Sequence, residues 1–228
     1  MNRWRAFFVS TIGSKIVMAV TGVMLLLFVF GHLAGNLQIF LGRTALNDYA
    51  AGLRKLGPLL WVARIGLLAA FLLHIDAAVR LTLRSQAARP VPYAKVRHSA
   101  TTYAARTMVI SGILVVLYVL YHLMHFTWGW VAPSAYQLTE MVDGVARHDV
   151  YGMVVAGFQQ PLIAIVYVVA QAVLAMHLSH GASSLMQTLG VRGPLFEGVK
   201  TYVGPAIALL VFVGYVSIPA AVLLGIVK

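Results

Sequence analysis

Long apolar segments separated by short polar connections dominate the hydrophobic pattern of this chain. Five segments each exceed the roughly 20 residues that a helix needs to cross the ~30 Å hydrocarbon layer of a membrane. None of them alternates apolar and polar residues with a period of two, so the pattern favours helices over the strands of a membrane barrel. We expect an all-α membrane protein with one domain over residues 1–228 and five transmembrane helices, at residues 16–41, 59–83, 106–130, 158–185 and 202–227.

The amino-acid composition agrees with a membrane protein. Hydrophobic residues make up 61% of the 228 residues and charged residues only 10%, with a mean hydropathy of +0.86. A soluble domain is about half apolar and about a quarter charged. A soluble enzyme is therefore excluded, because the polar residues are too few to cover a globule. The chain has no cysteine, which excludes disulfides, iron–sulfur clusters and thiolate zinc sites within it.

The basic residues indicate how the helices are oriented. The chain has 17 Lys and Arg against six Asp and Glu, a formal net charge of +11. In a membrane protein such residues contact anionic lipid and set the orientation of the helices, so the lipid bilayer and not nucleic acid is the expected partner. Eleven of the 17 fall on the side of the N-terminus, which we therefore expect in the cytoplasm. They are Arg3, Arg5, Lys15, Arg80, Arg84, Arg89, Lys95, Arg97, Arg106, Arg192 and Lys200.

Six of the eight histidines lie inside the predicted helices. They are His32, His74, His122, His125, His177 and His180. Polar rings are costly in hydrocarbon, and those found there normally face the interior of a helix bundle and have a function. Each of the first four helices carries at least one histidine, and the fifth carries none. We therefore expect the first four helices to form a bundle around a group that histidines bind.

Depth in the membrane sorts four of these histidines into two pairs. A helix rises 1.5 Å per residue and successive helices run in opposite directions, so His32 and His122 come near the outer face, and His74 and His177 near the inner face. The two layers are expected roughly 10–18 Å apart. Two imidazoles on facing helices suit bis-histidine haem ligation, whereas zinc requires a third or fourth ligand. We expect a distal, outer haem b at His32 and His122, a proximal, inner haem b at His74 and His177, and no other metal.

Two of the helices contain the pattern HxxH, which leaves an alternative ligand on each. His125 follows His122, and His180 follows His177, by three residues, so both members of each pair lie on one helix face. We favour the deeper members, His122 and His177, as iron ligands. The other two are expected to contact the haem through a propionate, or to bond a quinone oxygen or water.

Other polar residues near the helix ends have two interpretations each. Asp76 lies four residues before Arg80, which predicts an ion pair near the inner interface, with proton transfer as the alternative. Three residues at inner helix ends are candidates for neutralising haem propionates or for reaching lipid headgroups: Ser14, Lys15 and Arg106. Four at the outer end of the first helix are candidates for a quinone pocket or for helix capping: Asn36, Gln38, Arg43 and Asn47.

Several motifs carry a resemblance to a known family. They are GHLAGN at 31–36, LLHIDAAVRL at 72–81, YHLMHFTW at 121–128, MHLSHGASSLMQTLG at 176–190 and the stretch from Phe40 to Gly66. In this order and spacing the chain resembles the cytochrome b558 membrane subunit of succinate:quinone oxidoreductases and fumarate reductases, in the single-polypeptide, five-helix, dihaem class. In that family the first and third helices ligate the distal haem, and the second and fourth the proximal one. The family's fourth-helix ligand is followed by glycines that match Gly181 and Gly190, which favours His177 over His180.

The resemblance implies a role in respiration. The chain would anchor a flavoprotein subunit and an iron–sulfur subunit of succinate dehydrogenase in the bacterial cytoplasmic membrane. It would pass electrons between the iron–sulfur subunit and a quinone, with menaquinone favoured, and would contain no dicarboxylate site. Two features depart from family members: Ala175 replaces a glutamate that serves proton transfer in some fumarate reductases, and the connection at residues 132–157 is long. The alternatives are a cytochrome b subunit of a nitrate reductase or hydrogenase, and a haem-free transporter or anchor.

Overall fold

A computed structural model describes residues 7–8, 10–88, 102–188, 190 and 194–228 of the chain. Five of its helices are long and apolar enough to span a membrane, which confirms the predicted all-α, five-helix membrane protein. They are α2 (Thr11–Asn36), which continues into the 3₁₀ helix η1 (Leu37–Leu41), α4 (Pro58–Ala87), α6 (Met108–Phe126), α9 (Pro161–Thr188) and α10 (Pro194–Leu223). Six of the basic residues counted for orientation lie outside the described residues: Arg3, Arg5, Arg89, Lys95, Arg97 and Arg192.

Capping and turn residues move several helix ends away from their predicted positions. The first helix begins at residue 11 rather than 16 because the Ser10 hydroxyl caps it, accepting a 2.9 Å hydrogen bond from the Gly13 N–H. The third helix ends at Phe126 rather than at residue 130, since the chain turns at Gly129, whose φ is +69°. The fourth begins at Pro161, because proline suits the first turn of a helix and does not continue the preceding one.

The connections between the spanning helices contain short elements of their own. They are α3 (Arg43–Lys55), α5 (Tyr103–Arg106), α7 (Pro133–Tyr136), β1 (Thr139–Val142), β2 (Val145–His148) and α8 (Val150–Phe158). The two strands form an antiparallel hairpin. Its turn, Asp143–Gly144, has positive φ at both residues, 52° and 78°, as a type I′ turn requires. This hairpin is the one departure from the predicted all-α fold among the described residues, and it lies outside the membrane spans.

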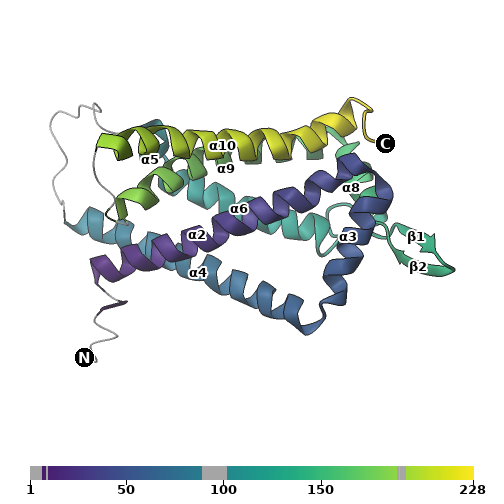
Figure 1. The fold of residues 1–228 in the computed structure, drawn as a ribbon, viewed down its shortest axis with the longest axis horizontal. Helices are drawn as coiled ribbons and strands as arrows, with labels where there is room; N and C mark the ends of the chain where they lie inside the picture. Colours follow the sequence, from purple (N-terminus) through teal and green to yellow (C-terminus); the bar gives the residue numbers. More distant parts are fainter. Residues whose placement is uncertain (1–6, 9, 89–101, 189, 191–193) are drawn as a thin grey trace.

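The spanning helices pack as a four-helix bundle with a fifth helix against its side. Helix α2 packs along α4, α6 packs along α9, and α2 also contacts α9, so the four form one bundle. Helix α10 lies along α9 and also contacts α2 (Figure 1). Helices α2 and α4 lie close together near the N-terminal end of α2 and diverge toward the other end, where α3 spans the space between them (Figure 1).

The largest buried cluster lies at the end of the bundle where α3 and α8 pack. It includes Ile39, Leu46, Tyr151, Phe158 and Tyr167, from the four elements η1, α3, α8 and α9. Along the rest of the spans, by contrast, large apolar side chains such as Leu27, Val62 and Leu209 are exposed. An apolar surface of this kind is stable only in contact with lipid, so the burial pattern agrees with a multi-pass membrane protein.

Candidate functional site

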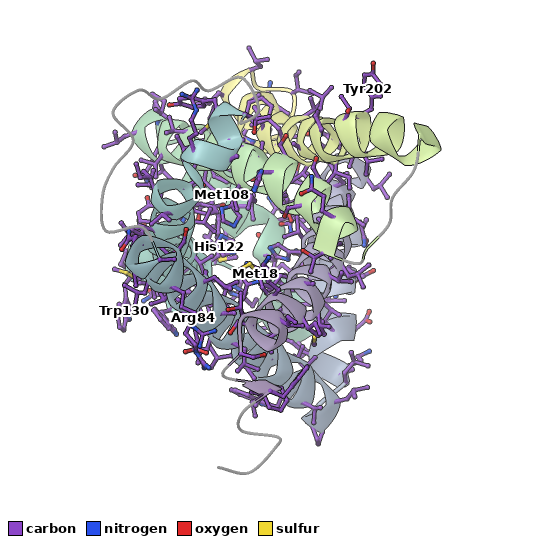
Figure 2. The ribbon with its side chains drawn as sticks, turned by 90° about the vertical axis from the view of Figure 1, so that its left-hand side faces the viewer. Met18, Arg84, Met108, His122, Trp130 and Tyr202 are labelled. Atoms are coloured by element: carbon purple, nitrogen blue, oxygen red, sulfur yellow. The ribbon has the colours of Figure 1, made fainter. Side chains whose placement is uncertain are left out.

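The interior of the bundle brings the two outer histidines together. The rings of His32 on α2 and His122 on α6 have centroids 5.8 Å apart and planes at 88°. Two imidazoles on opposite sides of one metal ion have ring centroids about 6 Å apart. This distance is the sum of two metal–nitrogen bonds of about 2 Å and the distance from each nitrogen to the centre of its ring. The separation therefore suits a shared metal. Figure 2, which looks along the bundle from the N-terminal end of α2, shows His122 near the middle of the ring of helices, while Trp130 and Tyr202 lie at its periphery.

The two inner histidines are each held by a hydroxyl group on a neighbouring helix. The Nδ1 atom of His74 on α4 lies 3.1 Å from the Thr21 hydroxyl on α2. The Nδ1 atom of His177 on α9 lies 3.1 Å from the Ser111 hydroxyl on α6. The four helices thus contribute one histidine each to the interior, and the rings of His32 and His122 lie side by side.

The hydrogen bonds of these hydroxyls define which nitrogen of each inner imidazole is available. The Thr21 hydroxyl donates its only proton to the Val17 carbonyl at 2.7 Å. It can therefore only accept from His74, so Nδ1 carries the proton and Nε2 keeps its lone pair. The Ser111 hydroxyl has the same two kinds of contact, at 3.1 Å to the Met108 carbonyl of its own helix and at 3.1 Å to His177 Nδ1. A metal-binding histidine normally has this arrangement, with its second nitrogen donating to a nearby oxygen.

The spacing between the two layers is the same on both helices that carry the hydroxyls. Eleven residues separate Thr21 from His32 on α2, and eleven separate Ser111 from His122 on α6. At 1.5 Å per residue the layers lie about 16 Å apart along the bundle. A glycine follows each hydroxyl residue, so the pattern [ST]-G-x₉-H occurs once on each helix. The sequence analysis missed Thr21 and Ser111, and this repeated pattern is the signal that would have found them.

The glycines in this pattern face the inner histidines. A Cβ atom added to Gly22 would lie 3.4 Å from His74 Cε1, and one added to Gly112 would lie 3.5 Å from His177 Cε1. Both rings are half-buried. A flat group bound beside them would thus meet only backbone at these two positions. The two glycines thus allow the inner histidine rings to approach the backbone of the neighbouring helices closely.

His125 differs from the four paired histidines in its packing. Its side chain is fully buried, with 1% of its surface exposed, whereas the paired histidines are half-buried. Its Nδ1 lies 3.0 Å from the Tyr167 hydroxyl, and a Cβ at Gly157 would lie 3.0 Å from its Nε2. The ring is thus packed against α8 and α9, and its buried Nε2 has no hydrogen-bond partner among the described residues. The same Tyr167 hydroxyl lies 3.4 Å from His122 Nδ1, so it links the two histidines.

The remaining candidates for haem contacts lie at the inner end. His180 on α9 is half-buried, one turn beyond His177, and Lys15 on α2 is exposed. Arg106 is exposed and places its guanidinium 5.8 Å from the centre of the Tyr103 ring. The predicted i,i+4 ion pair between Asp76 and Arg80 is confirmed, with Arg80 Nε 2.9 Å from Asp76 Oδ1.

The candidates for an outer quinone pocket are largely occupied by contacts within the protein. Asn47 is buried, donates to Asp149 Oδ1 at 2.8 Å and accepts from the Tyr151 N–H at 2.9 Å. Arg43 pairs with the other oxygen of Asp149 and lies over the Tyr151 ring. These contacts join α3 to α8, so the structure does not support a quinone-binding role for Arg43 and Asn47.

The other two candidates for the outer quinone pocket, Asn36 and Gln38, also show no contact that points to a pocket. The Asn36 side chain donates to the His32 carbonyl of its own helix at 2.6 Å, which is a helix-end contact. Gln38 is half-buried within η1. The outer quinone pocket therefore stays a prediction from the sequence.

A polar contact lies between the two histidine layers. The Gln171 side chain on α9 donates to the Tyr118 hydroxyl on α6 at 2.8 Å. Gln171 is buried, and its Oε1 has no partner among the described residues. Within the same part of the chain, no group of three or more His, Asp or Glu forms a metal site.

We compared the chain with protein-family models, curated proteins and solved structures and found no match to any of them. The fold and the two histidine pairs therefore define the class of the protein only as a multi-pass helical membrane protein with a polar, histidine-containing interior. Any more specific function has to be argued from its own residues.

Proposed function

We propose that this chain is a dihaem cytochrome b that transfers electrons through the membrane. The observation that supports the proposal best is the placement of four histidines in two pairs, one ring from each of four helices, about 16 Å apart along the bundle. His32 and His122 would hold one haem b, and His74 and His177 the other. A haem b held by two histidines exchanges single electrons and has no free position for dioxygen.

The other residues of the site would keep the histidines in a ligating form. Thr21 and Ser111 would accept from Nδ1–H of the inner pair and leave Nε2 for the metal, and Tyr167 contacts His122 on its Nδ1 side. Gly22 and Gly112 present no side chain to the rings of His74 and His177. The lipid-facing apolar surface of the bundle keeps bulk water away from both pairs. These are the orienting and screening functions that a protein supplies to a bound redox group.

We further propose that the chain is the membrane anchor of a succinate:quinone oxidoreductase. This assignment is supported by the sequence motifs that resemble cytochrome b558 and by the allocation of one ligand to each of the first four helices. The partners would be a flavoprotein subunit and an iron–sulfur subunit, and the electron acceptor a quinone such as menaquinone. The excess of basic residues on the N-terminal side supports an orientation with that side facing the cytoplasm, and the bacterial cytoplasmic membrane is what the resemblance implies.

Purification of the full chain from membranes tests both proposals. A pyridine haemochromogen assay should give two protohaems per chain, and a reduced-minus-oxidised spectrum should show b-type bands. If the chain is a succinate dehydrogenase anchor, two further subunits should copurify and the complex should reduce a naphthoquinone when succinate is added. Absence of haem from fully assembled protein would overturn the cytochrome proposal. Two haems without succinate-dependent quinone reduction would overturn the second proposal alone, and would favour a nitrate reductase or hydrogenase subunit.

A further inference from the structure

One hydroxyl group contacts both histidines of the HxxH pattern on α6. The Tyr167 hydroxyl on α9 lies 3.0 Å from His125 Nδ1 and 3.4 Å from His122 Nδ1. Within the described residues these two contacts are its only hydrogen bonds, and the side chains of both histidines have no other hydrogen-bond partner. A phenol has one proton to donate and lone pairs that accept, so it can accept from one histidine while it donates to the other.

Aromatic packing holds the phenol of Tyr167 in this position. Tyr167 has only 5% of its surface exposed, and its ring meets the Phe158 ring edge to face, with centroids 5.0 Å apart. Phe126 meets the same ring at 5.6 Å and stacks on the His125 ring at 3.9 Å. Closely packed side chains of this kind stay in one rotamer, so the hydroxyl stays between the two histidines.

The lengths of the two contacts indicate the direction of each hydrogen bond. A hydrogen bond donated by an O–H group is typically shorter than one donated by an N–H group. The phenol is therefore expected to donate its proton to His125 Nδ1, which lies at the shorter distance of 3.0 Å. Its oxygen then accepts from the Nδ1–H group of His122. This direction leaves Nε2 of His122 with its lone pair, which is the form that binds a metal.

The surroundings of the two histidines agree with this direction. The reverse direction would leave the Nε2 lone pair on His125, at an atom that is buried close to the backbone of Gly157. In the described part of the chain, no second histidine ring packs against His125. The His122 ring, by contrast, lies 5.8 Å from that of His32 across the bundle. A metal-binding nitrogen is thus useful on His122 and has no opposite ligand on His125.

We propose that Tyr167 and His125 are positioning residues that make His122 the ligand of the outer haem and strengthen its bond to the iron. A ligand imidazole becomes a better electron donor when its other N–H group is hydrogen-bonded to an acceptor. His125 improves the phenol oxygen as that acceptor, because hydrogen bonds in a chain polarise one another. This role rests on the proposed cytochrome function, since it requires a haem between His32 and His122.

Redox titration of the purified full-length protein, followed in the difference spectrum, tests this role. A more strongly donating imidazole favours the ferric state of its haem, so Tyr167→Phe should raise the midpoint potential of one haem and leave the other unchanged. The same haem should bind about 10-fold to 100-fold more weakly. Unchanged potentials of both haems in Tyr167→Phe would overturn the proposal.

Further variants separate hydrogen bonding from packing. His125→Leu removes the acceptor of the phenol proton and should shift the same haem in the same direction, by a smaller amount, whereas His125→Asn keeps an acceptor near Nδ1 and should restore the original potential. Tyr118→Phe is the matched control. The Tyr118 and Tyr167 rings both lie 6.0 Å from the His122 ring, but the Tyr118 hydroxyl bonds Gln171 and not a histidine. Equal shifts in Tyr118→Phe and Tyr167→Phe would contradict the proposal.

The histidine tautomers give a second measurement, which needs no haem. Nitrogen NMR of protein with isotope-labelled histidine should show His122 protonated at Nδ1 and His125 at Nε2, assigned from the spectra of His122→Ala and His125→Asn. These tautomers in protein that lacks haem would support the direction of the hydrogen bonds and overturn the cytochrome proposal. The opposite tautomers, or two haems whose potentials do not respond to Tyr167→Phe, would overturn the positioning role and leave the cytochrome proposal intact.

Discussion

The imidazole of His74 and the hydroxyl of Thr21 form a hydrogen bond, 3.1 Å long, that joins two of the spanning helices. The hydroxyl accepts in this bond because its proton is given to the Val17 carbonyl. The contact between His177 and Ser111 repeats the arrangement on the other helix pair. Both inner histidines are therefore contacted by a hydroxyl on a neighbouring helix. Removing that hydroxyl should weaken haem binding while leaving the histidine itself in place.

The first prediction concerns Thr21→Val, which keeps the shape of the side chain and removes the acceptor. Loss of such an orienting contact typically lowers the affinity of a metal site about 10-fold to 100-fold. We expect the inner haem to dissociate more readily by this factor, measured by haem titration followed in the difference spectrum. Thr21→Ser keeps the hydroxyl and should behave as the original protein. Wild-type affinity in the valine variant would show that the hydroxyl does not orient a haem ligand.

The second prediction separates the members of each HxxH pattern. His122→Ala should reduce the haem content from two per chain to one, whereas His125→Ala should retain two, because the buried His125 packs against Gly157 and already contacts the Tyr167 hydroxyl through Nδ1. The same comparison of His177→Ala with His180→Ala should again show loss in the first variant only. A pyridine haemochromogen assay on purified protein gives the count. Retention of both haems in His177→Ala would transfer the ligand role to His180.

The spanning helices and the histidine pairs were accessible from the sequence because each depends on a regular quantity. The length of an apolar run determines whether a helix crosses the membrane, and a fixed rise per residue determines depth. Both predict the pairing of His32 with His122 without any knowledge of side-chain contacts. The exact helix ends were less accessible, since Ser10 and Gly129 act through local hydrogen bonding and turn geometry.

The contacts between distant segments could not be predicted from the same information. Asn47 was grouped with a quinone pocket because it lies near other polar residues, but its partner Asp149 is 102 residues away along the chain. The hairpin at β1 and β2 was also missed, since its strands are only four residues long and the spans around it dominate the pattern. The contacts of Thr21 and Ser111 depend on how each helix is rotated about its own axis. The repeated [ST]-G-x₉-H pattern is the only indication of that rotation in the sequence.

The third prediction follows from the Asn47–Asp149 contact at the outer end. Asn47→Ala leaves the buried Tyr151 N–H without its partner and removes one of the two hydrogen bonds to Asp149 Oδ1, which keeps the one from the Gly152 N–H. An unpaired buried group costs about 1–3 kcal/mol, so the free energy of unfolding should fall by about 2 kcal/mol, measured by denaturation in detergent. Ser184→Ala removes only a hydroxyl bonded within its own helix and is the control. Equal stability of the two variants would contradict a structural role for Asn47.

The fourth prediction concerns the pH dependence of the hairpin through His148, which lies outside the membrane spans. Partial burial, and next the nearby Arg54, lower the pKa of His148 from its usual 6.5, against smaller opposing effects of Asp149 and of a hydrogen bond with the Leu138 backbone. Below pH 6.5 the unfolded hairpin therefore binds more protons than the folded one, so folding becomes less favourable as the pH falls from 6.5 toward the lowered pKa. After correction for the intrinsic effect of pH on exchange, the hydrogen exchange of residues 139–148 should become faster as the pH falls through this range. His148→Gln, which cannot titrate, should abolish the extra acceleration, and an unchanged pH profile in that variant would assign the effect to another group.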